Sequence, residues 1–308
     1  MPLVKSDIPN MLEAGLKAVF FEEYDRASAD WERIATVVPS VTDTEDYAWL
    51  GSVPAMREFK DERLPAGLLE HGYSIKNKTW EASIAVERAA LEDERYGQIK
   101  LRVQGLGREA RRHQDELVFT LLRCGFSTPC YDGQFFFDTD HVSGEGGSQA
   151  NKGTSPLSAS ALQTAISAMM KYEDERGKPM GVIPDLLVVP PDLQWTAMEL
   201  LNSTYYPELV SQTGGTGGTQ KLAANVLKGK LDLVVSPYLT DSTDWFLMCT
   251  RGPVKPLLFQ SRLPVEFAAL ESNSENGFMR DEYLYGVRAR YNVGFGLWQM
   301  VYGSQVSG

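Results

Sequence analysis

The chain has 308 residues, 43% of them hydrophobic, and its 30 Lys and Arg against 41 Asp and Glu give a net charge of −11. This composition excludes a largely disordered chain, and the acidity argues against recruitment of polyanions by net charge. No run of about 18 apolar residues is present and the start lacks an apolar stretch, so we expect neither a transmembrane helix nor a signal peptide. Cys124, Cys130 and Cys249 cannot all pair and lack zinc-knuckle spacing, which favours a reducing compartment. The length is typical of about two domains.

The first predicted element is an amphipathic helix over residues 6–29. Leu12, Leu16 and Phe20 recur in it at helical spacing, and such a stripe indicates one face that requires burial. Acidic side chains are predicted to form its solvated side. We expect this helix to lie in an extended N-terminal segment that finds part of its burial on other copies of the chain.

Residues 55–88 are predicted to form a long, polar hairpin. Its second strand alternates apolar residues, among them Trp80, Ile84 and Val86, with more polar ones, a pattern typical of a strand with one buried face. The hairpin has too few apolar residues for a core of its own, and an isolated hairpin is only marginally stable. We expect its apolar face to lie on the rest of the chain or, failing that, on a neighbouring subunit.

Residues 94–122 are predicted to form a single helix about 40 Å long, because apolar side chains recur at steps of three, four and seven. Gly105 and Gly107 favour a bend in its middle, and Gly125 favours a stop just after it.

The next segment is predicted to be irregular. Residues 131–141 contain an Asp-Gly turn, a short buried strand at 135–137 and then a polar loop. Residues 142–156 are rich in Gly, Ser and Asn, which is typical of a flexible connection. We therefore expect a domain boundary there.

Residues 157–264 are predicted to form a compact α/β unit. Its expected elements are helices over 158–176 and 193–201, strands over 185–189, 231–235 and 245–248, and a Gly/Thr-rich loop over 211–221. Residues 282–302 alternate in aromatic and aliphatic side chains and predict two long strands. We expect this tail to return and pack on the long helix.

Two polar groups suggest chemistry. Asp138, Asp140 and His141 offer the oxygen and nitrogen atoms that a metal ion prefers. The alternative, which we favour, is a turn in which Asp138 caps local backbone amides. The loop around Gly214 and Gly217 resembles a phosphate cradle but lacks its Lys-Ser/Thr ending, so a mobile surface loop is the better interpretation.

The remaining candidates are the thiols and a basic patch. Cysteines among apolar neighbours are expected to be buried and structural. Arg108, Arg111 and Arg112 form a basic patch on the long helix, which could meet a nucleic-acid phosphate or the acidic side of a neighbour. The alternative is a solvated helix face paired with nearby glutamates. No catalytic constellation stands out, and we expect no cofactor.

Three stretches carry a resemblance to a known family. They are residues 131–141 (YDGQFFFDTDH), residues 235–239 with 245–247 (VSPYL and WFL), and residues 285–298 (YGVRARYNVGFGLW). With the order of predicted elements, they resemble the major head (capsid) subunit of Mu-type tailed phages and prophages, the gpT family. The resemblance runs along nearly the whole chain.

The resemblance implies an α+β fold of the Hong Kong 97-type capsid class. Its parts would be an N-terminal arm (1–47), an extended E-loop hairpin (48–90), a peripheral domain with a long spine helix (91–155 and 262–308) and an axial domain (156–261). It also implies a structural protein of the phage head, assembled in the host bacterial cytoplasm through pentamers and hexamers into an icosahedral shell around double-stranded DNA. A separate scaffold, a portal and, in some relatives, a decoration protein would be its partners, with no membrane and no sequence-specific DNA binding.

The candidate inter-subunit contacts follow from these parts. They are Lys60, Arg63, Trp80, Ile84 and Val86 in the E-loop, Leu12, Leu16 and Phe20 in the arm, Arg108, Arg111 and Arg112 in the spine helix, and Gly214 and Gly217 in the axial loop. A covalent cross-link from a lysine such as Lys60, Lys76 or Lys78 is not expected. Two other functions are weighed: a cellular compartment shell of the same fold that encloses a cargo enzyme, and a metal-dependent hydrolase using Asp138, Asp140 and His141.

Overall fold

The structure is a computed structural model that describes residues 8–47, 72–87, 96–142, 147–174, 176–210, 219–252, 254–270 and 279–306. Its helices are α1 (Ile8–Arg26), α2 (Trp31–Ile34), α4 (Tyr96–Cys124), α5 (Ala159–Met169) and α6 (Gln194–Asn202), with 3-10 turns at Pro191–Leu193 and Trp298–Met300. Among the described residues, no helix combines the length and the apolar character that crossing a bilayer requires.

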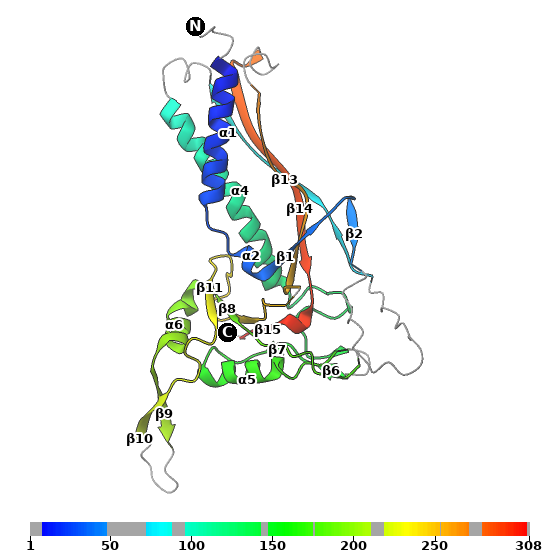
Figure 1. The fold of residues 1–308 in the computed structure, drawn as a ribbon, viewed down its shortest axis with the longest axis vertical. Helices are drawn as coiled ribbons and strands as arrows, with labels where there is room; N and C mark the ends of the chain where they lie inside the picture. The colour runs from blue at the N-terminus through cyan, green and yellow to red at the C-terminus, as the bar shows by residue number, and fades with distance from the viewer. Residues whose placement is uncertain are drawn as a thin grey trace, which may run out of the picture.

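The elongated upper part of the molecule is a four-stranded sheet with two helices along one face (Figure 1). The strand order is β1 (Ala35–Pro39), β13 (Leu257–Leu270), β14 (Glu282–Phe295) and β4 (Lys78–Glu87). Strand β1 runs parallel to β13, whereas β14 is antiparallel to both β13 and β4. The sheet thus joins two segments from the first third of the chain to two segments near its end.

Helices α1 and α4 pack against each other and against this sheet. The apolar stripe of α1 contributes Leu16 and Phe20 to a core that also holds Val103 of α4 and Tyr285 of β14. Gly107 lets the helices approach closely, because a Cβ at this position would lie 2.6 Å from the backbone oxygen of Phe20. Helix α4 ends as predicted at Gly125, whose N–H donates to the Leu122 carbonyl.

The lower part is a five-stranded sheet with the order β11 (Asp232–Val235), β8 (Leu186–Val189), β12 (Trp245–Met248), β15 (Val301–Ser304) and β7 (Lys152–Gly153). Helices α5 and α6 cover one face, where their apolar side chains pack on Leu187, Val189 and Leu247. The alternate residues of the same strands, including Val188 and Phe246, face a second core with the end of α4. This alternation is that of a sheet buried on both faces.

Short antiparallel pairs complete the fold. Strand β2 (Thr44–Asp46) pairs with β3 (Ser74–Lys76), and β5 (His141–Val142) pairs with β6 (Ser148–Gln149). Strands β9 (Tyr205–Val210) and β10 (Thr219–Ala224) form a hairpin that projects from the lower end of the molecule (Figure 1). This hairpin flanks the predicted Gly/Thr-rich loop, whose residues 211–218, with Gly214 and Gly217, lie outside the described residues.

The structure overturns one prediction about a segment and decides another. Residues 147–156 are not a flexible connection, because Asn151 is fully buried and β7 extends the five-stranded sheet. The described part of the predicted hairpin contains β3 and β4, which pair with β2 and β14 of the same chain and not with each other. The peripheral sheet and α4 therefore supply the surface that the hairpin needs. Residues 48–71, with Lys60 and Arg63, lie outside the described residues.

The predicted domain division lies across the five-stranded sheet. Strands β8, β11 and β12 fall in the expected axial segment, whereas β7 and β15 fall in the expected peripheral segment. The two predicted domains therefore share one continuous sheet. The division itself stays a prediction.

Candidate functional site

The region between α4 and the four-stranded sheet is the first candidate. Here Trp80 of β4, His113 of α4 and Tyr291 of β14 line a groove of about 240 Å³. The His113 Nδ1 atom and the Tyr291 hydroxyl are 2.8 Å apart, and the Trp80 indole N–H donates to the Tyr291 carbonyl at 2.9 Å. Burial lowers the pKa of His113 and raises that of Tyr291. The Tyr291 hydroxyl therefore donates a hydrogen bond to the neutral imidazole of His113, and this bond joins the helix to the sheet.

The predicted basic patch is paired within the chain. Arg108 donates to the Glu23 carboxylate of α1, and Arg111 donates to Glu32 at 2.7 Å. Glu23 is buried, and the hydrogen bond from Arg108 holds its pKa below the usual range. Arg112 is exposed and lies 3.5 Å from Glu109 on its own helix. Two of the three arginines thus bind α1 and α2 to the spine helix.

The N-terminal arm residues are buried by their own chain. Leu16 and Phe20 are both fully buried among α4, β13 and β14. The expectation that this helix needs other copies to bury its apolar face is therefore wrong, because α4 and the long strands cover it. The Leu12 side chain lies outside the described residues. Contact of this segment with a neighbouring subunit stays a prediction.

The E-loop residues of β4 follow the same pattern. Val86 is buried in the same core as Phe20, and Ile84 packs half-buried at its border. Trp80 is half-buried beside His113, with the ring centroids 4.4 Å apart. The exposed parts of the Trp80 and Ile84 side chains are available to a neighbouring subunit. Contact of these residues with that subunit also stays a prediction.

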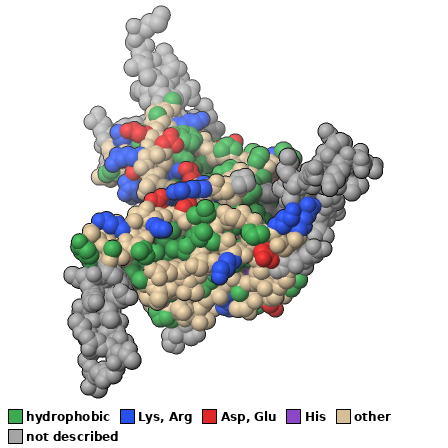
Figure 2. Space-filling view, turned by 60° about the horizontal axis from the view of Figure 1, so that its bottom comes forward, with side chains coloured by type: hydrophobic (Ala, Val, Ile, Leu, Met, Phe, Trp, Pro, Cys, Tyr) green, Lys and Arg blue, Asp and Glu red, His purple; other side chains and the backbone are tan. Residues whose placement is uncertain are grey.

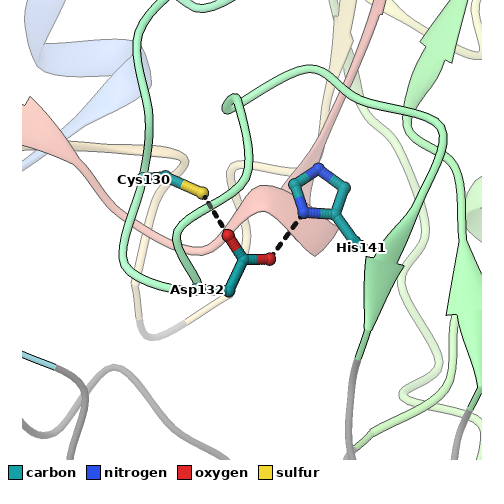
Figure 3. A group of neighbouring side chains, drawn as sticks. All are labelled: Cys130, Asp132 and His141. Atoms are coloured by element: carbon teal, nitrogen blue, oxygen red, sulfur yellow. Dashed lines mark hydrogen bonds and ion pairs between the residues drawn. The ribbon is translucent and has the colours of Figure 1, made fainter.

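A buried polar group brings together three side chains from the segment that runs from the end of α4 into strand β5 (Figure 3). Cys130 and Asp132 come from the turn after α4, and His141 comes from β5. Asp132 Oδ1 accepts from the Cys130 thiol at 3.0 Å, and Oδ2 lies 2.6 Å from His141 Nδ1. The His141 ring is fully buried and stacks on Trp298 at 4.2 Å. The stacking on Trp298 links this group to the last part of the chain.

Asn151 fixes the hydrogen-bonding role of the histidine. Its amide N–H₂ donates to the carbonyls of Phe136 and Trp298, so its Oδ1 atom accepts, from the Asp138 N–H and from His141 Nε2 at 3.1 Å. The Nε2 atom therefore carries a hydrogen, and Nδ1 faces a carboxylate oxygen. With its hydrogen on Nε2, the neutral ring offers only a lone pair at Nδ1, and the facing Asp132 Oδ2 is also an acceptor. A proton or a metal ion must therefore lie between these two atoms.

The geometry favours the proton. Burial raises the pKa of Asp132, but the hydrogen bonds from His141 and Cys130 outweigh it and hold that pKa below its usual range. The ligand atoms of Cys130, Asp132 and His141 lie within 4.8 Å of one another, which matches a metal-binding set. However, tetrahedral zinc would hold its nitrogen and oxygen ligands about 3.3 Å apart, against the 2.6 Å found here. Burial also raises the pKa of Cys130 and disfavours its thiolate.

The Asp138–Asp140–His141 group, weighed above as a metal site against a capping turn, does not form as a cluster. The one group of metal-ligand type among the described residues contains His141 but neither aspartate. Asp138 instead accepts the Thr139 N–H at 2.8 Å, which confirms the capping turn. Sequence reasoning missed the Cys130–Asp132–His141 group, although Cys130 precedes and His141 closes the unusual stretch at 131–141.

Comparison with known proteins identifies the fold and family. A family model described as "Mu-like prophage major head subunit gpT" matches residues 10–158, 148–239 and 240–307. The chain is 30% identical over 303 residues to the Mu-like prophage FluMu major head subunit of Haemophilus influenzae, which covers 98% of this chain and 74% of that protein.

Solved structures agree. The procapsid of bacteriophage JBD30 matches with 27% identity and a TM-score of 0.56, over 99% of this chain and 77% of the other. A virus-like particle from Pyrococcus furiosus shares the fold at 10% identity, with a TM-score of 0.57 over 95% of this chain and 98% of the other. The chain therefore belongs to the Mu-like prophage major head subunit gpT family, whose members are structural capsid proteins of the phage head with the Hong Kong 97-type fold and not enzymes.

Proposed function

We propose that the subunit assembles through pentamers and hexamers into an icosahedral head that encloses double-stranded DNA, with the help of a separate scaffold and a portal. The observation that carries the proposal is the match to the gpT family along nearly the whole chain. The elongated helix-and-sheet part joined to a compact α/β part supports it, because such a subunit offers several distinct surfaces to its neighbours.

The charge distribution supports an enclosing role without sequence-specific binding of DNA. The chain carries a net charge of −11, and Arg108 and Arg111 of the spine helix are occupied by Glu23 and Glu32. Tight binding to the DNA backbone requires several free basic side chains on one surface. We therefore propose that the genome is held by closure of the shell.

A decoration protein is a further proposed partner. One solved capsid of bacteriophage JBD30 is decorated with minor capsid protein trimers. We propose the same class of partner for the outer surface of this head.

Co-expression with and without the scaffold tests the proposal. We expect closed particles of uniform size with the scaffold, seen by negative-stain microscopy, and DNase-resistant DNA in heads purified from a phage-producing host. Particles filled with a cargo enzyme instead of DNA would point to a compartment shell. A subunit that stays monomeric with its scaffold, at all concentrations tried, would contradict the proposal.

A further inference from the structure

The groove between α4 and the four-stranded sheet holds space that the side chains of the subunit leave empty. Its volume is about 240 Å³, which exceeds the roughly 150 Å³ of an apolar cavity that holds benzene. It is smaller than the roughly 300–1,000 Å³ that is typical of sites for larger ligands. The groove therefore has room for one aromatic ring with a short substituent.

Short apolar side chains create this space. Ala82 of β4, Ala110 of α4 and Ala289 of β14 line the groove together with Val265 and Val287. A larger side chain at one of the alanine positions would fill the gap between the helix and the sheet. Walls of this kind favour a ligand whose body is apolar, because its burial removes apolar surface from water.

Hydrogen bonds hold the aromatic end of the groove in shape. The Trp80 indole N–H donates to the Tyr291 carbonyl, and the Tyr291 hydroxyl donates to His113 Nδ1. The ring centroids of Trp80 and His113 are 4.4 Å apart. The subunit itself therefore fixes these rings, and a preorganised site loses less conformational freedom when a ligand binds.

His113 offers one unused hydrogen-bond donor at the groove. Because Nδ1 accepts from Tyr291, the hydrogen of the neutral ring is on Nε2. The Nε2 atom has no hydrogen-bond partner among the residues that the structure describes, and it is not enclosed by them. An acceptor atom of a ligand in the groove can therefore bind to it.

The charges at the border of the groove favour an uncharged ligand. Glu81, Glu109 and Arg288 line it and are exposed, so they can stay hydrated. Arg112 lies 3.5 Å from Glu109 and balances it. The border thus attracts neither anions nor cations strongly, and an ion placed between the apolar walls would lose its hydration without compensation.

We propose that this groove is a binding site for an uncharged molecule with one aromatic ring and one hydrogen-bond acceptor, such as a carbonyl oxygen. The ring lies against the alanine and valine side chains, and the acceptor binds the His113 Nε2–H. Such a ligand contacts α4, β4 and β14 at once. It therefore binds the folded subunit and stabilises the packing of the spine helix on the sheet.

A segment of protein chain fits the groove less well than a small molecule. An extended segment would bring several backbone N–H and C=O groups, whereas the groove offers one free donor among apolar walls. The apolar side chains exposed at the end of the compact part lie instead on a rounded surface among polar ones (Figure 2). A surface of that shape cannot enclose a small molecule.

Fluorine NMR of the unassembled full chain with two matched probes tests the inference. The first probe is 4-fluoroacetophenone, which has about ten non-hydrogen atoms, and we expect a dissociation constant on the order of 1 mM or lower. The second is 1-ethyl-4-fluorobenzene, which has nearly the same shape and no acceptor. It is expected to bind about three- to tenfold more weakly, the effect of one hydrogen bond.

Variants locate the bound probe. Ala110→Leu fills the groove from the helix and Ala82→Leu from the sheet, and each is expected to weaken binding more than tenfold. Ala18→Leu, at an exposed position of α1, is the matched control and should bind as the wild type does. His113→Phe removes the donor and should abolish the preference for the ketone. Circular dichroism and melting of each variant separate loss of binding from loss of folding.

The outcomes that overturn the inference are distinct. Unchanged affinity in a folded variant with a filled groove would mean that the probe binds elsewhere. Equal affinity of the two probes would remove the role of His113, and no binding of either probe up to its solubility limit would remove the site. A probe that binds free subunits but not assembled particles would mean that a neighbouring copy occupies the groove, which also overturns the inference. The proposed function is tested separately, by particle formation.

Discussion

The backbone carbonyl of Phe20 lies 2.6 Å from the place where a Cβ on Gly107 would stand, so α1 and α4 cross backbone against backbone. This crossing anchors the N-terminal helix along the spine helix. It also explains a glycine in the middle of a 29-residue helix, where glycine normally costs about 1 kcal/mol relative to alanine. The cost is offset by the close packing that the missing side chain allows.

Replacing this glycine is expected to push the two helices apart. We expect Gly107→Ala to lower the free energy of unfolding by about 1–3 kcal/mol, because backbone atoms cannot move aside for the new methyl group. Gly105→Ala is the matched control, since nothing lies within 4 Å of a Cβ there. That variant should be unchanged or more stable by up to about 1 kcal/mol, from helix propensity. Urea unfolding of the unassembled subunit measures both, and equal effects would contradict the close crossing.

The N-terminal helix is expected to stabilise the subunit itself and not only the assembled shell. Phe20 is fully buried against Phe267 and its neighbours. Phe20→Ala should therefore cost about 3–5 kcal/mol of unfolding free energy in the unassembled chain. The exposed Leu101 of α4 is the comparison, and Leu101→Ala should change stability by less than about 0.5 kcal/mol. A Phe20→Ala subunit with wild-type stability would mean that the helix detaches before assembly.

Asp115 gives the subunit a predictable pH dependence. Burial raises the pKa of Asp115 to about 6, despite the hydrogen bond that it accepts from the Trp31 N–H. In the unfolded chain the pKa is near its ordinary value of about 3.9. At pH values between these two pKa values, Asp115 is protonated in a larger fraction of folded chains than of unfolded chains. Its contribution to stability therefore falls as the pH rises through this window.

Asparagine keeps the acceptor for Trp31 and removes the charge. We expect Asp115→Asn to be more stable than the wild type by about 1 kcal/mol at pH 8, a figure reduced for the partial exposure of the carboxyl group. At pH 3.5 the two should be nearly equal. Thermal melts across this range measure the difference, with the exposed Glu116→Gln as control. A difference that grows as the pH falls would contradict the assignment.

The Cys130–Asp132–His141 group is expected to be a structural clamp. Asp132→Ala leaves the fully buried His141 Nδ1 without a partner, and breaking a buried pair in this way costs about 3–5 kcal/mol. Asp132→Asn should cost less, because the carboxamide can donate to a neutral Nδ1 and still accept from Cys130.

Cys130→Ala measures the contribution of the thiol alone, because it leaves the Asp132–His141 pair in place. It should cost about 1–2 kcal/mol, the value of a weak donor and a small cavity. Chemical unfolding ranks the three variants. A larger loss for Asp132→Asn than for Asp132→Ala would contradict the hydrogen-bonding roles assigned by Asn151. Loss of a bound metal ion on any of these changes would contradict the proton between Nδ1 and Oδ2.

Local pattern was sufficient for elements whose signal is contained in a few residues. The predicted end of the spine helix at Gly125 and the strand over 245–248 are both confirmed. Strand β13 escaped prediction because it contains Pro264 and its register with β14 shifts between Ser261 and Leu263 and again between Leu263 and Glu266. These shifts interrupt the period of two by which a strand is recognised.

Contacts between distant segments could not be predicted from local pattern. The apolar stripe of α1 indicates that Leu16 and Phe20 require burial, but the pattern does not identify which other elements bury them. The same holds for the buried polar group, because Asn151 lies in a segment whose composition favours a flexible loop. The resemblance to the gpT family supplied the fold, since it compares whole segments at once.

Strand β15 is the last strand in chain order, yet it lies inside the five-stranded sheet between β12 and β7. While the nascent chain is still on the ribosome and residues 301–304 have not emerged, β12 keeps an open edge lined by Phe246 and Leu247. Such an edge favours sticking to other chains. Prematurely terminated chains would therefore keep this edge of β12 open and would lack the strand that joins β7 to the sheet.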